Sequence, residues 1–276
     1  MALLEKTFKV GDITLSYGEG PNNGDPMVLL HGITGWRQAW DDTVIAHYEA
    51  LWHLYAIDLR GHGKSSHAAD ENAYHIVDFV NDIVAFITSN IDQPTVIVGH
   101  SLGAMTAMGV GAQLGDAVRA LVLLDPPLSM RELPLTDLPD LNIGLTMLYG
   151  LISQNPPYEV ILEACRQLEP EADENTLRQL AKQYQCLDPR AVKLAIESRG
   201  LGGFDFAATL EAITCPVLLM PAQFRRSGLM RDKDIAFVAQ HTHNLQTVQM
   251  PYDDHVFFMT HWDETEPHIT TFLGAL

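Results

Sequence analysis

A serine between two glycines is the first feature of the sequence that could carry out chemistry. The run Gly-His-Ser-Leu-Gly at positions 99–103 follows a short apolar segment, residues 95–98, and precedes a helical stretch of small residues, 104–114. A serine on a tight strand-to-helix turn presents its hydroxyl above the sheet, and the glycines leave room for neighbouring backbone. The pattern predicts that Ser101 is a nucleophile, with an ordinary glycine-flanked turn as the alternative.

Two backbone amides could stabilise the negative charge that forms when this serine attacks a carbonyl group. Leu102 lies at the N-terminal end of the helical stretch 104–114, where the backbone N–H is free and the helix end is positive. The run His-Gly-Ile-Thr-Gly-Trp at 31–36 follows another apolar segment, and its glycines permit a turn that presents N–H groups. The N–H groups of Ile33 and Leu102 are the predicted oxyanion hole. Trp36 is interpreted as a packing residue or a wall of the substrate pocket.

A third glycine-containing run, Asp-Leu-Arg-Gly-His-Gly-Lys-Ser at 58–65, superficially suggests a phosphate-binding loop. It lacks the Gly-x-x-x-x-Gly-Lys-Ser/Thr spacing that such a loop needs to surround phosphates with N–H groups. We therefore interpret this run as a structural turn.

The elements that must position these residues follow an alternating pattern. The clearest helical stretch, residues 73–90, carries apolar residues at i, i+3 and i+4 spacing. Strands alternating with helices predict an α/β fold, with a mostly parallel sheet covered by helices on both faces. Short apolar runs predict strands at 7–10, 13–17, 27–30, 54–57, 95–98, 121–124, 216–220 and 245–248.

The alternation stops in the middle of the chain. Residues 129–212 contain no strand-like run and several helical ones, at 158–168, 176–185 and 191–198. An all-helical insert in an α/β core is typical of a cap over a site. We therefore expect a core domain of residues 1–128 and 213–276 and a helical cap of residues 129–212.

One part of this insert, residues 141–152, is apolar on more than one helical face. Met147, Leu148 and Leu151 are expected to line an apolar pocket over Ser101, because ligand sites are mostly apolar with few polar groups. The alternative is a helix buried between cap and core.

The combined motifs resemble those of the α/β-hydrolase family, specifically its capped members of the esterase and lactonase type. The resemblance rests on the loop at 31–36, the runs at 58–65 and 99–103, and the order of strands around a helical insert. It implies an α/β-hydrolase fold and a Ser–acid–His catalytic triad in that chain order. It says little about the substrate, because one scaffold supports many reactions.

The resemblance also implies which histidine is the base. His255 stands shortly after the last predicted strand, 245–248, where the family places this residue. The family often has glycine before the histidine, whereas this chain has Asp254. Adjacent residues rarely orient each other's rings, so Asp254 is interpreted as a loop charge and not as the triad acid.

The acid departs from the commoner pattern of the family, which carries it a few residues after the strand that follows the cap. Here no carboxylate follows residues 216–220 until Asp232 and Asp234. Asp125 instead ends the predicted strand 121–124, at the sheet edge expected to bear the nucleophile. Asp125 is the preferred acid. Asp232 and Asp234 remain alternatives, although they also suit the start of a helix.

Composition excludes several classes of partner. The chain has 276 residues, with 35 acidic and 17 basic side chains and a net charge of −18. Such a surface repels phosphate backbones and anionic lipids, so we expect no nucleic-acid and no membrane partner. The N-terminus has no apolar signal stretch, and no apolar run approaches the roughly 20 residues of a membrane span. A cytoplasmic protein of unspecified oligomeric state is expected.

The cysteines indicate neither a disulfide framework nor a zinc site. There are three, which is an odd number, and they are far apart in the sequence. No metal or organic cofactor is expected. The three are Cys165, Cys186 and Cys215.

These observations favour a serine hydrolase that cleaves a small apolar ester or lactone through an acyl-enzyme. Ser101 attacks the carbonyl, His255 takes and returns the proton, and Asp125 fixes the tautomer of the histidine. Two alternatives use the same fold. One is a carbon–carbon bond hydrolase or cofactor-free dioxygenase with the Ser/His pair as a base, and the other is a ligand-binding module. Dehalogenation is disfavoured, because relatives with that activity have aspartate in place of Ser101.

Overall fold

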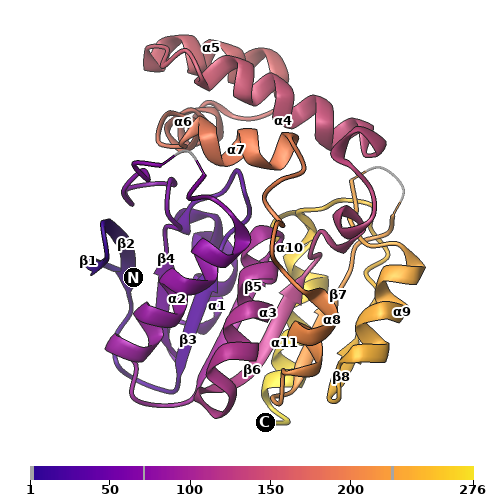
Figure 1. The fold of residues 1–276 in the computed structure, drawn as a ribbon. Helices are drawn as coiled ribbons and strands as arrows, with labels where there is room; N and C mark the ends of the chain where they lie inside the picture. Colours follow the sequence, from indigo (N-terminus) through magenta and orange to yellow (C-terminus); the bar gives the residue numbers. More distant parts are fainter. Residues whose placement is uncertain (1–2, 71, 225–226) are drawn as a thin grey trace.

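The computed structural model describes residues 3–70, 72–224 and 227–276 (Figure 1). Within these residues, eight strands form one sheet in the order β1-β2-β4-β3-β5-β6-β7-β8. β1 pairs antiparallel with β2 and β2 with β4, whereas all the pairs from β4 to β8 are parallel. The strands are β1 (Leu4–Val10), β2 (Ile13–Glu19), β3 (Pro26–Leu30), β4 (His53–Ile57), β5 (Thr95–His100), β6 (Val118–Leu124), β7 (Val217–Met220) and β8 (Leu245–Thr247).

Both faces of the sheet are buried, as expected for parallel strands covered by helices. Successive side chains of a strand point to opposite faces, so Ile97 joins one apolar cluster while Val96 and Val98 join the other. This double burial explains why the central strands are continuous apolar runs. The predicted α/β fold is confirmed.

Helices cover the two faces as separate layers (Figure 1). One face carries α2 (Ile76–Asn90), α3 (Leu102–Leu114), α8 (Phe206–Glu211) and α9 (Asp232–His241). The other carries α1 (Ala46–Tyr48), α10 (Phe257–Thr260) and α11 (Trp262–Leu273). Short 3-10 or π turns complete the chain at Arg37–Trp40, Asp41–Ile45, Gly115–Ala117, Leu128–Arg131 and Leu135–Asp137. None of the helices in the described ranges is long and apolar enough to cross a bilayer.

Four helices between β6 and β7 lie together over one end of the sheet (Figure 1). They have apolar clusters of their own, with Leu148 and Val192 in one and Ile161 and Leu177 in another. α8 lies within the residue range expected for the cap, which ended at residue 212, but it packs on α3 and α9 beside the sheet. The four helices are α4 (Pro139–Ile152), α5 (Tyr158–Leu168), α6 (Glu174–Gln185) and α7 (Pro189–Ile196).

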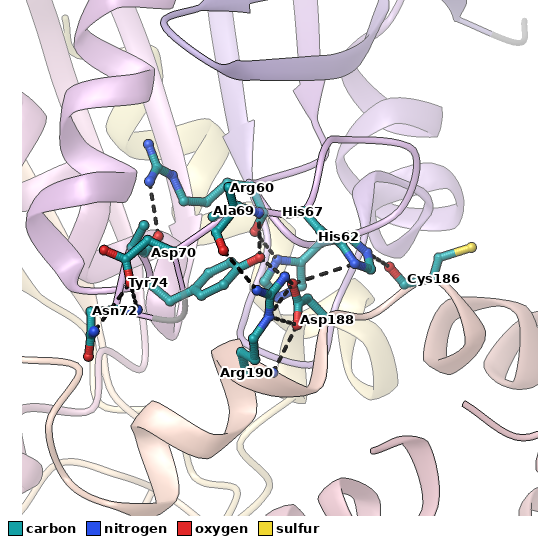
Figure 2. A network of polar contacts seen from close by, with 12 residues as sticks. Arg60, His62, His67, Ala69, Asp70, Asn72, Tyr74, Cys186, Asp188 and Arg190 are labelled. Atoms are coloured by element: carbon teal, nitrogen blue, oxygen red, sulfur yellow. Dashed lines mark hydrogen bonds and ion pairs between the residues drawn. The ribbon is translucent and has the colours of Figure 1, made fainter. Parts of the chain in front are cut away.

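A buried polar junction joins these helices to the core (Figure 2). Asp188, directly before α7, accepts a hydrogen bond from the Tyr74 hydroxyl and forms an ion pair with Arg190 Nη2 at 2.6 Å. Its backbone N–H donates to the Gly61 carbonyl at 2.7 Å. Burial opposes ionisation of Asp188, but the hydrogen bonds from Arg190 and Tyr74 outweigh it and lower the pKa of the carboxyl. Burial and the Asp188 contact raise the pKa of Tyr74.

Candidate active site

Ser101 occupies a strained turn between β5 and α3. Its backbone has a φ of 53° and a ψ of −117°, a conformation that costs energy for a residue with a side chain. The backbones around it are too close for other residues, because a Cβ on Gly99 would overlap the Gly103 carbonyl and a Cβ on Gly103 would overlap the Leu30 carbonyl. The Ser101 N–H donates to the Leu124 carbonyl at 3.0 Å. The turn is thus held against the neighbouring strand end.

Asp125 directly follows β6 and is fully buried. Its Oδ2 accepts hydrogen bonds from His255 Nδ1 at 2.6 Å and from the Leu229 N–H at 3.1 Å. Its Oδ1 accepts from the Ala222 N–H at 3.1 Å. Three donors therefore fix the orientation of this carboxylate.

The Asp125 contact determines which nitrogen of His255 is available for chemistry. A carboxylate only accepts hydrogen bonds, so Nδ1 carries the proton and Nε2 of the neutral ring is an acceptor. The backbone of His255 is held as well. Its N–H donates to Ser227 Oγ at 3.0 Å, and its carbonyl accepts from His100 Nε2 at 2.9 Å. Burial, with His255 nearby, holds the pKa of His100 well below its usual range, so His100 adds no charge beside His255.

The peptide that carries the Ile33 N–H is oriented by hydrogen bonds to its carbonyl. The Gly32 carbonyl accepts from His31 Nδ1 at 2.8 Å and from the Gly35 N–H at 2.9 Å. In a trans peptide the N–H points away from the carbonyl, and Ile33 lines the same cavity as Ser101 and Leu102. The Leu102 N–H lies in the first turn of α3, where it has no partner within the helix.

The run at 58–65 supports this loop, consistent with its interpretation as a structural turn. His31 Nε2 accepts from the Leu59 N–H at 3.0 Å, and burial holds the pKa of His31 well below its usual range. His62 Nε2 lies 2.7 Å from the Ile33 carbonyl. The Leu59 N–H and the His62 side chain therefore support the loop that carries the predicted oxyanion-hole residue Ile33.

The cavity over Ser101 and His255 has a volume of about 140 Å³. α4 contributes Leu141 and Leu145, α7 contributes Ala191 and Ala195, and α3 contributes Met105. Among the described residues, its lining contains no lysine, arginine, aspartate or glutamate. The site is a small, mostly apolar space whose lining includes the Ser101 hydroxyl, the His255 imidazole and the residues Ile33 and Leu102.

The structure corrects the expected positions of four pocket residues. Met147, Leu148 and Leu151 line a groove next to the cavity and not the cavity itself, and Trp36 lines neither. The reason is the helical period of α4, which places residues 141 and 145 toward Ser101 and turns residues 147 and 151 away. Leu148 packs in the cap's own apolar cluster.

The structure brings neither alternative acid to His255. Asp232 begins α9, and Asp234 is buried in its first turn. Asp234 Oδ2 accepts from Arg231 Nε at 2.6 Å and from the Arg231 N–H at 3.0 Å. Both acids thus belong to the helix start. The two arginines of the preceding loop, at positions 225 and 226, lie outside the described residues.

Sequence reasoning missed the residues that support Asp125 and His255. Ala222, Leu229 and Ser227 belong to the segment after β7, which folds back over the strand ends. No sequence motif identifies these residues, because two of the three act through backbone N–H groups, which every residue except proline has. His100 lies within the serine motif at a position where the motif itself specifies no residue.

Comparison with known proteins agrees with this fold. A family model described as the alpha/beta hydrolase fold matches residues 25–168, and the chain belongs to this family. It is 36% identical to lipase LipV of Mycobacterium tuberculosis over 40% of this chain and 41% of the relative. It is 26% identical to N-formylmaleamate deformylase of Pseudomonas putida over 94% of this chain and 90% of the relative.

Solved structures extend the likeness over the whole chain. The crystal structure of E-2-(acetamidomethylene)succinate hydrolase has a TM-score of 0.76 and 23% identity, and the match covers 99% of each chain. At this identity the likeness shows the fold. The chain matches 41% to 46% of the length of the first curated relatives.

Proposed function

We propose that this protein is a serine hydrolase that cleaves an uncharged, small-acyl ester or lactone through an acyl-enzyme. The observation that carries the proposal is the 2.6 Å hydrogen bond between His255 Nδ1 and buried Asp125, beside a cavity that also contains Ser101. A nucleophile, a base and a group that orients the base are the parts of a triad.

The reaction proceeds in two halves. Ser101 Oγ bonds to the substrate carbonyl carbon while its proton moves to His255 Nε2, and the N–H groups of Ile33 and Leu102 stabilise the oxyanion. The carbon–oxygen bond to the leaving group then breaks, and the leaving oxygen takes the proton from Nε2. Water then attacks the acyl carbon of the acyl-enzyme and gives a proton to His255. The bond to Ser101 Oγ breaks, and His255 returns the proton to Ser101 as the acid is released.

The cavity lining favours an uncharged acyl group. A carboxylate buried without a cationic partner is costly, and the described lining residues include no lysine or arginine. The acidic substrates in the names of the deformylase and the succinate hydrolase are therefore not favoured here. A lactone fits the same chemistry, with the alcohol remaining tethered to the acyl group.

The helices α4–α7 act in this proposal as a cap that excludes water from the cavity. The net charge of −18 disfavours nucleic acid and anionic membranes as partners, so a small-molecule substrate is proposed. A location in the cytoplasm is part of the same proposal.

A fluorophosphonate probe tests the nucleophile, because phosphorylation of an activated serine mimics acyl transfer. We expect stoichiometric labelling of Ser101, seen by mass spectrometry of the intact protein and its peptides, and none in Ser101→Ala. Ser198, a second serine of the cavity lining, provides the matched control, since Ser198→Ala should still be labelled. Label on another serine, or hydrolysis of a carbon–carbon bond by Ser101→Ala, would contradict the acyl-enzyme.

A further inference from the structure

A second hollow lies next to the cavity over Ser101. It is a groove of about 540 Å³ lined by residues of α4, α5 and α6, of which α6 packs against both α4 and α5 (Figure 1). Met147 and Leu151 of α4 and Leu168 of α5 line it, and so does His255. Its volume is nearly four times that of the cavity.

Leu141 and Leu145 border both hollows, so α4 forms the partition between them. His255 also borders both, and it therefore stands at their junction. Ser101 and the two residues of the proposed oxyanion hole, Ile33 and Leu102, border the cavity alone. The two hollows thus meet the catalytic groups from different sides.

This arrangement assigns the two halves of a substrate. The acyl carbon must reach Ser101 and its oxygen must reach the oxyanion hole, so the acyl half lies in the cavity. The leaving oxygen must take its proton from the histidine ring, so the leaving group lies beside His255. The groove contacts His255 without contacting Ser101, and it is therefore the space open to the leaving group.

We propose that the groove is a leaving-group subsite for a long, uncharged aliphatic alcohol, which makes the preferred substrate an ester of a small acyl group with such an alcohol. This inference rests on the proposed serine hydrolase function. It identifies which half of the substrate is long and where that half lies.

The walls of the groove indicate an apolar occupant. Met147 and Leu168 are 53% and 50% exposed, and grouped apolar side chains in a hollow mark a binding surface. The charged residues of the groove are Asp140 and Glu169, and its described lining includes no lysine or arginine. Anionic leaving groups such as a phosphorylated thiol carrier are therefore disfavoured.

The small size of the cavity limits the acyl half. A dry apolar cavity of about 150 Å³ holds one benzene molecule, and this cavity measures about 140 Å³. An acetyl to butyryl group fits without displacing Leu141 or Leu145. A long acyl chain would have to push α4 aside.

Two mirrored ester series test the assignment on the full-length protein, below the micellar concentration of each ester. Going from ethyl acetate to octyl acetate adds six methylenes to the alcohol, and half-burial of these is expected to raise kcat/KM by about 50-fold. Going from ethyl acetate to ethyl octanoate adds them to the acyl side, and overpacking is expected to lower kcat/KM by roughly tenfold. A preference for long acyl chains, or for acetyl thioesters of coenzyme A, would overturn the proposal.

Polar substitutions in the groove provide the second arm. Met147→Gln and Leu168→Gln should each lower the octyl-to-ethyl ratio of kcat/KM by about fivefold. Ile143→Gln and Val160→Gln are matched controls on the same two helices, 56% and 49% exposed and outside the groove lining, and should leave the ratio unchanged. Equal losses in all four variants would refute the subsite.

The two proposals fail in different ways. If Ser101 is not labelled and no ester is cleaved, the serine hydrolase function is wrong and the subsite falls with it. If esters are cleaved with labelled Ser101 but the rate is insensitive to the alcohol chain, only the subsite is wrong.

Discussion

Asp125→Asn changes one oxygen of a fully buried carboxylate into an NH₂ group that donates instead of accepting. The present oxygens accept three hydrogen bonds, from His255 Nδ1 and the Leu229 N–H at Oδ2 and from the Ala222 N–H at Oδ1. An amide has one accepting oxygen, so either orientation sets its NH₂ against a backbone N–H. The stability cost is therefore that of one buried unsatisfied donor, about 1–3 kcal/mol.

The catalytic cost depends on which way the amide turns. With its NH₂ toward His255, Nδ1 becomes the acceptor, the proton moves to Nε2, and the ring can no longer take a proton from Ser101. The resulting loss in kcat is about 10³–10⁴-fold, the order seen when a triad loses its orienting carboxylate. The backbone adds no further cost, since Asp125 has a φ of 43° and asparagine tolerates this region as well as aspartate does.

The assay compares kcat on an acetate ester with the free energy of unfolding from urea titration. Asp234→Asn is the matched control, because Asp234 is equally buried and neither it nor its ion-pair partner Arg231 is among the residues that line the cavity. It should lose about 1–3 kcal/mol of stability and little kcat. Near-normal turnover in Asp125→Asn, with collapse in Asp232→Asn or Asp234→Asn, would show that the acid has been assigned incorrectly.

Three further predictions concern stability. His31 and His100 are neutral in the folded protein because burial lowers their pKa values, so below about pH 6.5 the unfolded chain binds more protons than the folded one. The free energy of unfolding from urea titration should therefore fall by about 1.4 kcal/mol per pH unit for each histidine. Unchanged stability from pH 7 to 5.5 would contradict this. Tyr74→Phe removes a donor to buried Asp188 and an acceptor for the Ala68 N–H, and should lower the free energy of unfolding, followed by thermal unfolding, by about 1–3 kcal/mol. Tyr158→Phe, which removes an exposed hydroxyl, should cost almost nothing. Equal costs would refute the stabilising role of the Tyr74–Asp188 contact. Gly103→Ala should lower the melting temperature sharply or abolish folding, because the new Cβ overlaps the Leu30 carbonyl. In the control Gly144→Ala the new Cβ meets nothing within 4 Å, so this change should stabilise α4 by about 0.5–1 kcal/mol. A tolerated Gly103→Ala would show that the turn has more room than its geometry indicates.

The fold was predictable because its central strands are buried on both faces. β5 and β6 read as continuous apolar runs for that reason, and the predicted segments 95–98 and 121–124 fall inside them. Short helices were not predictable in the same way. α8 spans six residues and α10 spans four, which is too short for a 3.6-residue period to be distinguished.

The positions of Ser101 and Asp125 were predictable because both residues follow strand ends. Ser101 follows β5 and Asp125 follows β6, so chain order alone brings them to one edge of the sheet. The donors to Asp125 depend instead on the path of the loop after β7, and a sequence carries no local signal for that path. The pocket residues failed for a related reason, since α4 has apolar side chains on several faces and its rotation about its own axis is set by the packing of the insert.

The contact between Asp125 and His255 joins residues 130 positions apart, with the whole insert, β7 and β8 between them. During synthesis, a nascent chain that has not yet extended past β8 contains Ser101, the strained turn and Asp125, but not His255, the proposed base. Chains fold from their N-terminal part onward as they are made, so in the proposed mechanism the Ser101 hydroxyl has no base until residue 255 has been added. The proposed hydrolytic activity is therefore delayed until the sheet has gained its last strand, and chains truncated before His255 would lack it.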